Sequence, residues 1–214
     1  MFDLLYYCYF NINISEFESL NIDCLFGFWN ILQYNMNEYK KKVNIEIHKM
    51  KNKKTAYAMS HQDFDIMCAT NHWDDSNVEE LTDRAFISIV SSDECQKYYH
   101  EEDEEHWFKK DHPNVLNLAF DDITEDMVYN GHQFSAMTMG QAKKIFDFIE
   151  NNIGKNFSIH CRAGISRSGA ICCFILQMYE DMYIQSFSEL RRMRPNNHVL
   201  TALKRLYYEK YRMY

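Results

Sequence analysis

Three short apolar runs, rich in β-branched and aromatic residues, predict buried strands. They are residues 85–90 (AFISIV), 114–120 (NVLNLAF) and 156–160 (NFSIH). Segments with apolar residues at helical spacing precede, separate and follow these runs. The expected helices are 60–70 with Ser60 as N-cap, 136–151, 168–180, 184–193 and 198–212. The 168–180 segment is apolar nearly all round, so that helix should be buried.

Strands that alternate with helices predict an α/β domain with a central, mostly parallel sheet flanked by helices. The regular pattern opens near Ser60, after a weakly periodic stretch rich in Asn, Tyr, Phe and Ile and a lysine cluster. A chain of 214 residues suits one ordinary domain with an extension. We therefore expect an N-terminal extension of unknown role over residues 1–55 and a single folded domain over 56–214.

Charge and cysteine usage narrow the partners and the compartment. The formal net charge is -8, which disfavours nucleic acid as a partner. The seven cysteines form no CxxC pair, and the N-terminus lacks the basic region of a secretory signal, so we expect a cytoplasmic protein. No stretch is apolar for long enough to predict a membrane span. The acidic run 101–105, between His100 and His106, is typical of a solvated surface segment rather than a metal site.

The segment with the clearest chemistry is 159–169 (IHCRAGISRSG), between a predicted strand and the predicted buried helix. Ligands of open α/β sheets bind beyond the carboxyl ends of strands. A loop that leads there into a helix presents several backbone N–H groups together with the positive end of the helix dipole. Gly164 gives this loop the freedom to curl tightly. The segment therefore predicts an anion-binding cradle.

Side chains in this segment add reactive groups to the cradle. Cys161 lies at its start, where the same N–H groups should stabilise a nucleophilic thiolate. Arg167 should return to the opposite side, and its planar guanidinium can bind two phosphoryl oxygens at once. Ser168 can hydrogen-bond the sulfur and help it leave. His160 should orient the loop through hydrogen bonds.

The spacing His160-Cys161-x5-Arg167-Ser168 resembles the signature of the cysteine-based protein tyrosine phosphatases. The form HCRAGISRSG is most similar to the compact dual-specificity branch and its bacterial and phage relatives, and the similarity runs from about Ser60 to the C-terminus. This resemblance implies the fold of the cysteine-based protein phosphatases and the hydrolysis of phosphotyrosine, with phosphoserine and phosphothreonine as further substrates. It also implies a phosphocysteine intermediate and a reaction that needs neither metal nor cofactor. The residues expected to bind the phosphoryl group are Arg162, Ala163, Gly164, Ile165, Ser166 and Arg167.

The resemblance also implies a general acid, usually an aspartate on a separate loop before the cysteine, which protonates the leaving oxygen. Three aspartates follow the predicted strand 114–120. The family pattern fits Asp122 best, and Asp121 and Asp126 remain open. It also suggests that Asn196 supports the loop, although a helix stop with an Asx turn accounts for it equally well.

Other functions stay open at this stage. The chain could be a catalytically weak module that binds phosphoproteins, or a phosphatase for a non-protein phosphate ester; Arg162 is the one extra basic residue within the loop, which disfavours lipid substrates. A redox role, with Cys68 or Cys95 resolving an oxidised Cys161, is a further alternative. We expect a monomer that acts on phosphorylated proteins and associates with neither nucleic acid nor membrane.

Overall fold

The computed structural model describes residues 36–38, 40–41, 53–99, 104–184 and 191–211. The chain divides into two compact units, Met1–Lys51 and Asn52–Tyr214. Residues 36–38 and 40–41 of the first unit are helical. The extension expected over 1–55 lies almost wholly outside the described residues, so its boundary and role stay predictions.

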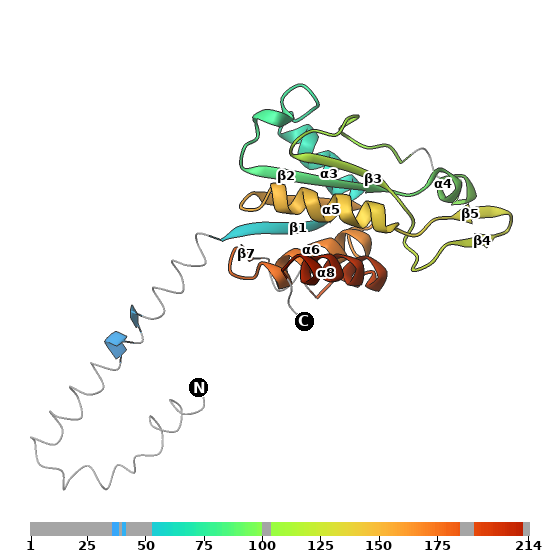
Figure 1. Ribbon diagram of the computed structural model, residues 1–214. Helices are drawn as coiled ribbons and strands as arrows, with labels where there is room; N and C mark the ends of the chain where they lie inside the picture. Colours follow the sequence, from blue (N-terminus) through green and yellow to red (C-terminus); the bar gives the residue numbers. More distant parts are fainter. Residues whose placement is uncertain (1–35, 39, 42–52, 100–103, 185–190, 212–214) are drawn as a thin grey trace, which may run out of the picture. The chain divides into compact units, whose positions relative to one another are not determined.

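A parallel five-stranded sheet forms the centre of the second unit, with the strand order β3-β2-β6-β1-β7 (Figure 1). Its strands are β1 (Lys54–Ser60), β2 (Arg84–Val90), β3 (Val115–Ala119), β6 (Asn156–Cys161) and β7 (Tyr183–Ile184). The three predicted strands are β2, β3 and β6, whereas β1 and β7 were not predicted. The α/β fold class with a parallel sheet flanked by helices is confirmed.

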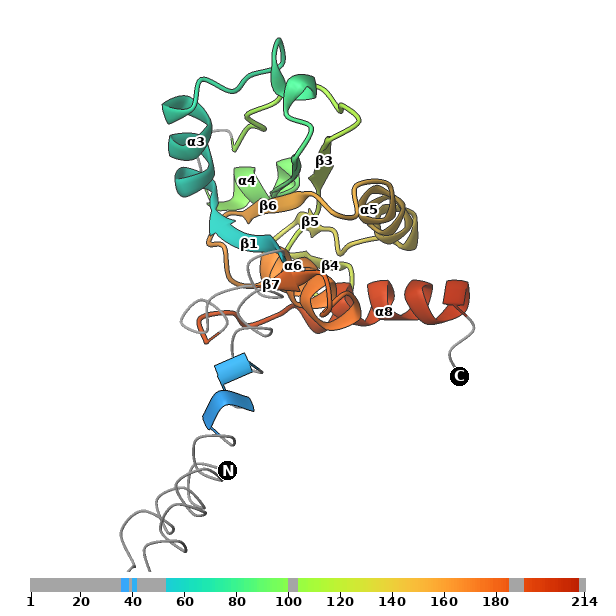
Figure 2. The same cartoon turned by 90° about the vertical axis from the view of Figure 1, so that its left-hand side faces the viewer.

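Helices cover both faces of this sheet: α3 lies on one face, and α5, α6 and α8 lie on the other (Figure 2). The helical elements are α3 (His61–Thr70), the 3-10 turn η2 (Val78–Glu80), α4 (Asp93–Tyr99), α5 (Met139–Asn151), α6 (Arg167–Met178) and α8 (Asn197–Tyr211). Ser60 caps α3 as predicted, since its hydroxyl accepts from the Asp63 N–H. The helix expected from residue 136 begins later, at Met139, because Thr138 and Gln141 form a capping box there.

The prediction of a helix over 184–193 is wrong at its two ends, which are the parts of this segment that the structure describes. Ile184 pairs with Thr55 as part of β7, and residues 191–192 form a turn. Residues 185–190 lie outside the described part. Strand pairing across the chain therefore decides the conformation of Ile184, which a local apolar pattern cannot indicate.

The strands that carry the site alternate their side chains between the two faces of the sheet. In β2, Ile87 and Ile89 pack with α5, α6 and α8 in the larger core, while Phe86 packs in a second core with Phe64 of α3. In β6, Cys161 shares the face of the larger core. His160 must therefore point to the opposite face, towards α3.

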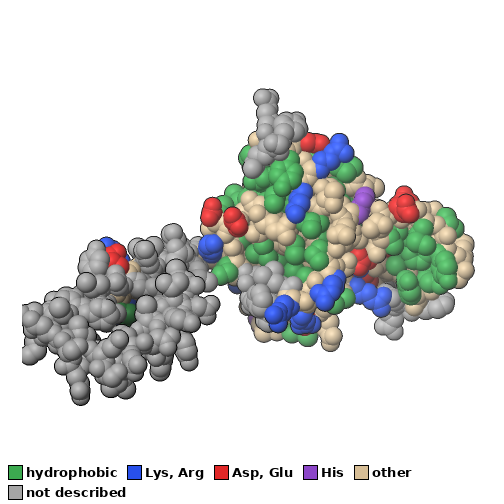
Figure 3. Space-filling view, turned by 90° about the horizontal axis from the view of Figure 1, so that it is seen from below, with side chains coloured by type: hydrophobic (Ala, Val, Ile, Leu, Met, Phe, Trp, Pro, Cys, Tyr) green, Lys and Arg blue, Asp and Glu red, His purple; other side chains and the backbone are tan. Residues whose placement is uncertain are grey.

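A two-stranded antiparallel hairpin, β4 (Met127–Tyr129) and β5 (His132–Phe134), follows the aspartate-rich loop. Its turn holds Asn130 and Gly131 at positive φ, as a two-residue hairpin turn requires. Hydrophobic side chains gather on the surface at this end of the domain, with Val128 and Tyr129 among the exposed ones (Figure 3). Within the described residues, we find no helix with the length and apolar character needed to cross a membrane.

Candidate functional site

The segment 162–166 connects the end of β6 to the start of α6, and we call it the phosphate loop after the ligand that the sequence predicts for it. Among the described residues, its backbone N–H groups at Ala163, Gly164, Ile165 and Ser166 donate to no protein acceptor. Ser166 precedes α6 without a side-chain hydrogen bond that caps the helix. Unpaired amides at an uncapped helix N-terminus are the arrangement that binds oxyanions.

Gly164 is held against the junction between β1 and α3. Its φ is +71°, in the left-handed region that favours glycine. A Cβ atom there would lie 2.5 Å from the Ser60 nitrogen and 2.7 Å from the Met59 oxygen, with the Met59 carbonyl carbon also in contact. The predicted need for glycine thus has two causes, the conformation of the loop and its close approach to the neighbouring strand.

Backbone hydrogen bonds from three segments fix the rest of the phosphate loop. The His61 N–H donates to the Arg162 carbonyl at 3.2 Å, and the Arg194 N–H donates to the Ile165 carbonyl at 3.1 Å. The Asn196 N–H donates to the Ser166 carbonyl at 3.2 Å. Because the loop accepts these hydrogen bonds through its carbonyl groups, its backbone N–H groups stay available to bind a ligand.

Cys161 lies at the base of the loop, and its side chain is 2% exposed. Its Sγ is 3.1 Å from the Ser168 Oγ, within hydrogen-bond distance for sulfur. Ser168 is fully buried in the first turn of α6. The sulfur therefore has a polar partner at the border of the larger core, as the sequence suggested for this pair.

Arg167 is buried with its guanidinium turned back towards the sheet. Its Nη1 donates to the Phe120 carbonyl at 2.7 Å and to the Ser91 Oγ at 3.4 Å. Its Nε is buried without a hydrogen-bond partner among the described residues. An N–H of a permanently charged group is costly to leave unpaired, which makes Arg167 a candidate anion ligand.

Asp122 is the aspartate that reaches the phosphate loop. Its Oδ1 accepts from the Ser166 Oγ at 2.7 Å and from the Asn196 Nδ2 at 2.9 Å. The Asn196 Oδ1 meanwhile accepts from the N–H groups of His198 and Val199 at the start of α8. Asn196 thus contacts the loop through its backbone, and its side chain caps the start of α8.

The two other candidate acids serve the backbone. Asp121 is 2% exposed, and its carboxylate accepts from the Ser92 N–H and hydroxyl and from the Ser135 N–H. Asp126 is exposed and accepts from the Ala136 N–H at 2.8 Å. Both carboxylates bind the segment 135–136 after β5, Asp121 also binds Ser92 before α4, and neither carboxylate has a hydrogen bond to the phosphate loop among the described residues.

His160 lies on the opposite face of the sheet from Cys161 and is completely buried. Its Nε2 is 2.7 Å from the Ser88 Oγ, and this hydroxyl is 2.6 Å from the His106 Nδ1. Burial, followed by the nearby His61, His106 and Arg167, lowers the pKa of His160 well below 6.5. His160 is therefore a neutral anchor for the end of β6.

The acidic run before His106 is not wholly solvated, contrary to the sequence interpretation. The Glu104 side chain is 8% exposed, and its Oε2 accepts from the Ser91 N–H at 2.9 Å. His106 is half-buried, and burial lowers its pKa. Glu104 thus orders the backbone of Ser91, whose hydroxyl contacts Arg167, and no local sequence signal marks it for this position.

The proposed resolving cysteines are poorly suited to redox chemistry. Cys68 and Cys95 are free thiols inside the fold. Burial raises the pKa of Cys68 to about 12 and that of Cys95 to about 11. Neither forms the thiolate needed for exchange near neutral pH.

Comparisons with known proteins give structural neighbours only. No protein-family model and no curated protein match the sequence. The human tyrosine phosphatase-like serine/threonine/tyrosine-interacting protein is 16% identical over 65% of this chain and 87% of its own, with a TM-score of 0.35. The Cydia pomonella PTP-2 phosphatase is 15% identical over 71% of this chain and 82% of its own, with a TM-score of 0.36. Tk-PTP in its active form is 20% identical over 70% of this chain and 87% of its own, with a TM-score of 0.32. Such low values assign no activity to this chain.

Proposed function

We propose that the domain over residues 56–214 is a protein phosphatase that hydrolyses phosphotyrosine, and more slowly phosphoserine and phosphothreonine. One observation carries this proposal: unpaired loop amides, a buried cysteine sulfur and an unpaired arginine N–H occur together at one uncapped helix N-terminus. The oxygens of a tetrahedral dianion can accept hydrogen bonds from the loop amides and from Arg167 at once, with the phosphorus atom facing the sulfur.

In the first step, the Cys161 thiolate attacks phosphorus, and the bond from phosphorus to the ester oxygen breaks. Asp122 gives its proton to that departing oxygen. The loop amides and Arg167 stabilise the equatorial oxygens, on which negative charge gathers. The products are a phosphocysteine and a neutral alcohol or phenol.

In the second step, water attacks the phosphocysteine, and Asp122 takes one of its protons. The sulfur–phosphorus bond breaks, and the sulfur leaves as a thiolate. The Ser168 hydroxyl stabilises this leaving group, which its distance of 3.1 Å from the sulfur supports. Phosphate then dissociates and restores the resting site.

We favour phosphotyrosine as the substrate because little of Cys161 is open to solvent. With Cys161 only 2% exposed, a long aromatic side chain reaches it more easily than the short side chain of phosphoserine. The alternative is an activity on small non-protein phosphate esters. Comparing kcat/KM for such esters with kcat/KM for phosphotyrosine peptides decides between the two.

A catalytically weak phosphoprotein-binding module is the second candidate, and one observation favours it. The Asp122 Oδ1 is already engaged by Ser166 and Asn196. Because these contacts hold the Asp122 carboxylate at the phosphate loop, Asp122 protonates a leaving group only where its other oxygen, Oδ2, reaches that group. A protein in which Oδ2 did not reach the leaving group would bind phosphotyrosine and turn it over slowly.

Kinetics on two substrates separate these functions. We expect Cys161→Ser to abolish turnover of both p-nitrophenyl phosphate and a phosphotyrosine peptide while retaining peptide binding. Arg167→Lys should lower kcat/KM by about 100-fold or more, because the planar fork is lost. Asp122→Ala should lower turnover of the peptide by about 100-fold or more and that of p-nitrophenyl phosphate far less, since nitrophenolate needs no proton to leave.

Asp126→Ala is the matched control, because it removes a neighbouring carboxylate that does not contact the phosphate loop. Its kinetics should equal those of the unaltered protein. Turnover that survives in Cys161→Ser refutes the mechanism. Peptide binding that requires Arg167, without turnover of either substrate, establishes the binding module instead.

A further inference from the structure

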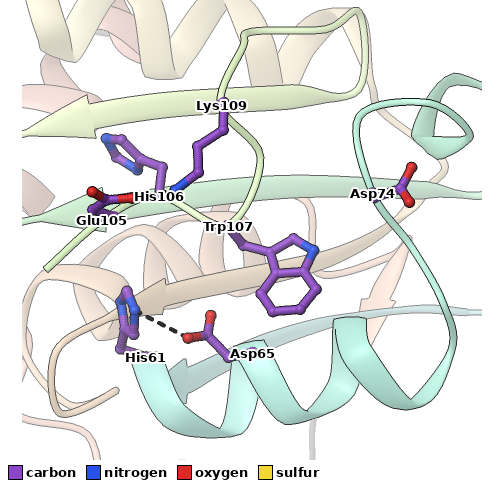
Figure 4. A pocket seen from close by; sticks show the side chains of 7 residues that line it. All are labelled: His61, Asp65, Asp74, Glu105, His106, Trp107 and Lys109. Atoms are coloured by element: carbon purple, nitrogen blue, oxygen red, sulfur yellow. Dashed lines mark hydrogen bonds and ion pairs between the residues drawn. The ribbon is translucent and has the colours of Figure 1, made fainter.

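A pocket of about 460 Å³ lies between α3 and the segment 104–109, on the face of the sheet opposite α6 (Figure 4). His61 and Asp65 line it from α3, and Trp107 and Lys109 line it from the facing segment. His61 also donates its backbone N–H to the Arg162 carbonyl. One end of the pocket therefore adjoins the phosphate loop.

The charge of this pocket is predominantly negative. Asp65, Asp74 and Glu105 line it, against the single lysine Lys109, which pairs with Glu105 at 2.5 Å. Asp65 faces the neighbouring ring of His61 at 3.2 Å. Desolvation raises the pKa of Asp65 more than His61 and Lys109 lower it. Burial in this pocket therefore disfavours the charged form of Asp65, and a bound cation would offset that penalty.

Three buried polar atoms at this end have no hydrogen-bond partner within the described part of the chain. They are the His61 Nδ1 and the Asp65 Oδ1, which belong to residues that line the pocket, and the Glu104 Oε1, which belongs to a residue behind His61 that does not line it. The Glu104 side chain is 8% exposed, and its Oε1 lies 3.7 Å from the His61 Nδ1, too far for a hydrogen bond. Buried acceptors without partners indicate a missing donor, because leaving them unpaired is costly.

The missing donor has the character of an organic cation. Among the described residues, no three His, Cys, Asp or Glu side chains are arranged to hold a metal ion. The Trp107 indole is fixed by a hydrogen bond of 2.7 Å from its N–H to the Trp73 carbonyl. A fixed aromatic ring beside carboxylates suits the alkyl stem and charged head of a basic side chain.

We propose that this pocket binds a lysine or arginine side chain that the substrate carries close to its phosphorylated residue. This inference rests on the proposed phosphatase function, and it names the substrate class: phosphopeptides with a nearby basic residue. The acidic pocket and the anion-binding loop then hold opposite charges of one peptide, which fixes its direction across the site.

A peptide scan tests the pocket directly. Phosphotyrosine peptides carry one lysine, placed in turn at each flanking position, and each has a partner peptide with norleucine in that place. We expect one lysine position to raise kcat/KM about tenfold over norleucine. Asp65→Asn should remove this preference while p-nitrophenyl phosphate, which has no basic group, is turned over at the original rate.

Asp147→Asn is the control for long-range electrostatics, because it removes the same charge from exposed α5 on the other face of the sheet. It should keep the lysine preference. A lysine preference that is absent, or that persists in Asp65→Asn, overturns the pocket proposal while leaving the phosphatase intact. Failure to hydrolyse p-nitrophenyl phosphate by the unaltered protein refutes the phosphatase function itself.

Discussion

Replacing Gly164 with alanine should destabilise the domain and disable the phosphate loop through one added methyl group. The residue has a φ of +71°, and an added Cβ would lie 2.5 Å from the Ser60 nitrogen. Carbon atoms normally keep about 3.5 Å from such neighbours, so the loop or the end of β1 must move by about 1 Å.

The cost has two parts. Placing alanine in the left-handed region costs about 1–2 kcal/mol. Overpacking against backbone atoms, which cannot rotate away as a side chain can, adds about 1–3 kcal/mol. The free energy of unfolding should therefore fall by about 2–5 kcal/mol. A displacement of about 1 Å at the loop amides should also lower kcat/KM by about 100-fold.

Urea unfolding and p-nitrophenyl phosphate kinetics on the full chain measure both effects. Gly154→Ala is the matched control, because Gly154 has a φ of +85° but nothing within 4 Å of the added Cβ. It should lose only about 1–2 kcal/mol and keep full activity. Equal losses of stability in the two variants, with normal kinetics for Gly164→Ala, would refute the close approach as the reason for glycine.

Three further predictions concern buried polar groups. Ser168→Ala should slow hydrolysis of the phosphocysteine, so stopped-flow traces should show a nitrophenol burst before a slower steady state; an unchanged steady-state rate contradicts this role. Asp121→Asn should lower the free energy of unfolding in urea by about 2–3 kcal/mol, because its carboxylate accepts three hydrogen bonds, whereas exposed Asp126→Asn should lose less than about 1.5 kcal/mol. The pKa of His160 is well below 6.5 in the folded protein. At a pH between that lowered pKa and 6.5, the imidazole binds a proton in the unfolded chain but not in the folded chain, so the free energy of unfolding falls as the pH drops below 6.5. His160→Gln should remove up to about 1.4 kcal/mol per pH unit of this slope, and identical slopes would contradict the burial of a neutral imidazole.

The phosphate loop could be predicted from the sequence because its parts are contiguous. Cys161, Gly164 and Arg167 lie within one strand–loop–helix unit, so their spacing fixes their approximate geometry. The choice among neighbouring aspartates could not be made in this way. Asp121 and Asp122 are adjacent, yet one is buried against the hairpin and the other reaches Ser166, because successive residues of an extended segment point in different directions.

Elements that depend on distant partners were missed. β1 contains small and polar residues, with Ala56 as its one fully buried side chain, and its pairing with β6 and β7 makes it a strand. The burial of Glu104 likewise depends on Ser91. The β4–β5 hairpin is different, because Asn130-Gly131 is a strong local turn signal from which a hairpin could have been predicted.

Trapping the covalent intermediate tests the central claim most directly. Acid quenching of the protein during turnover of a phosphotyrosine peptide, followed by mass spectrometry of its proteolytic fragments, locates any phosphoryl group. We predict a phosphate on the fragment that contains Cys161, at a higher level in Ser168→Ala and absent in Cys161→Ser. Turnover without phosphate on that fragment, or phosphate attached to another residue, would contradict the mechanism.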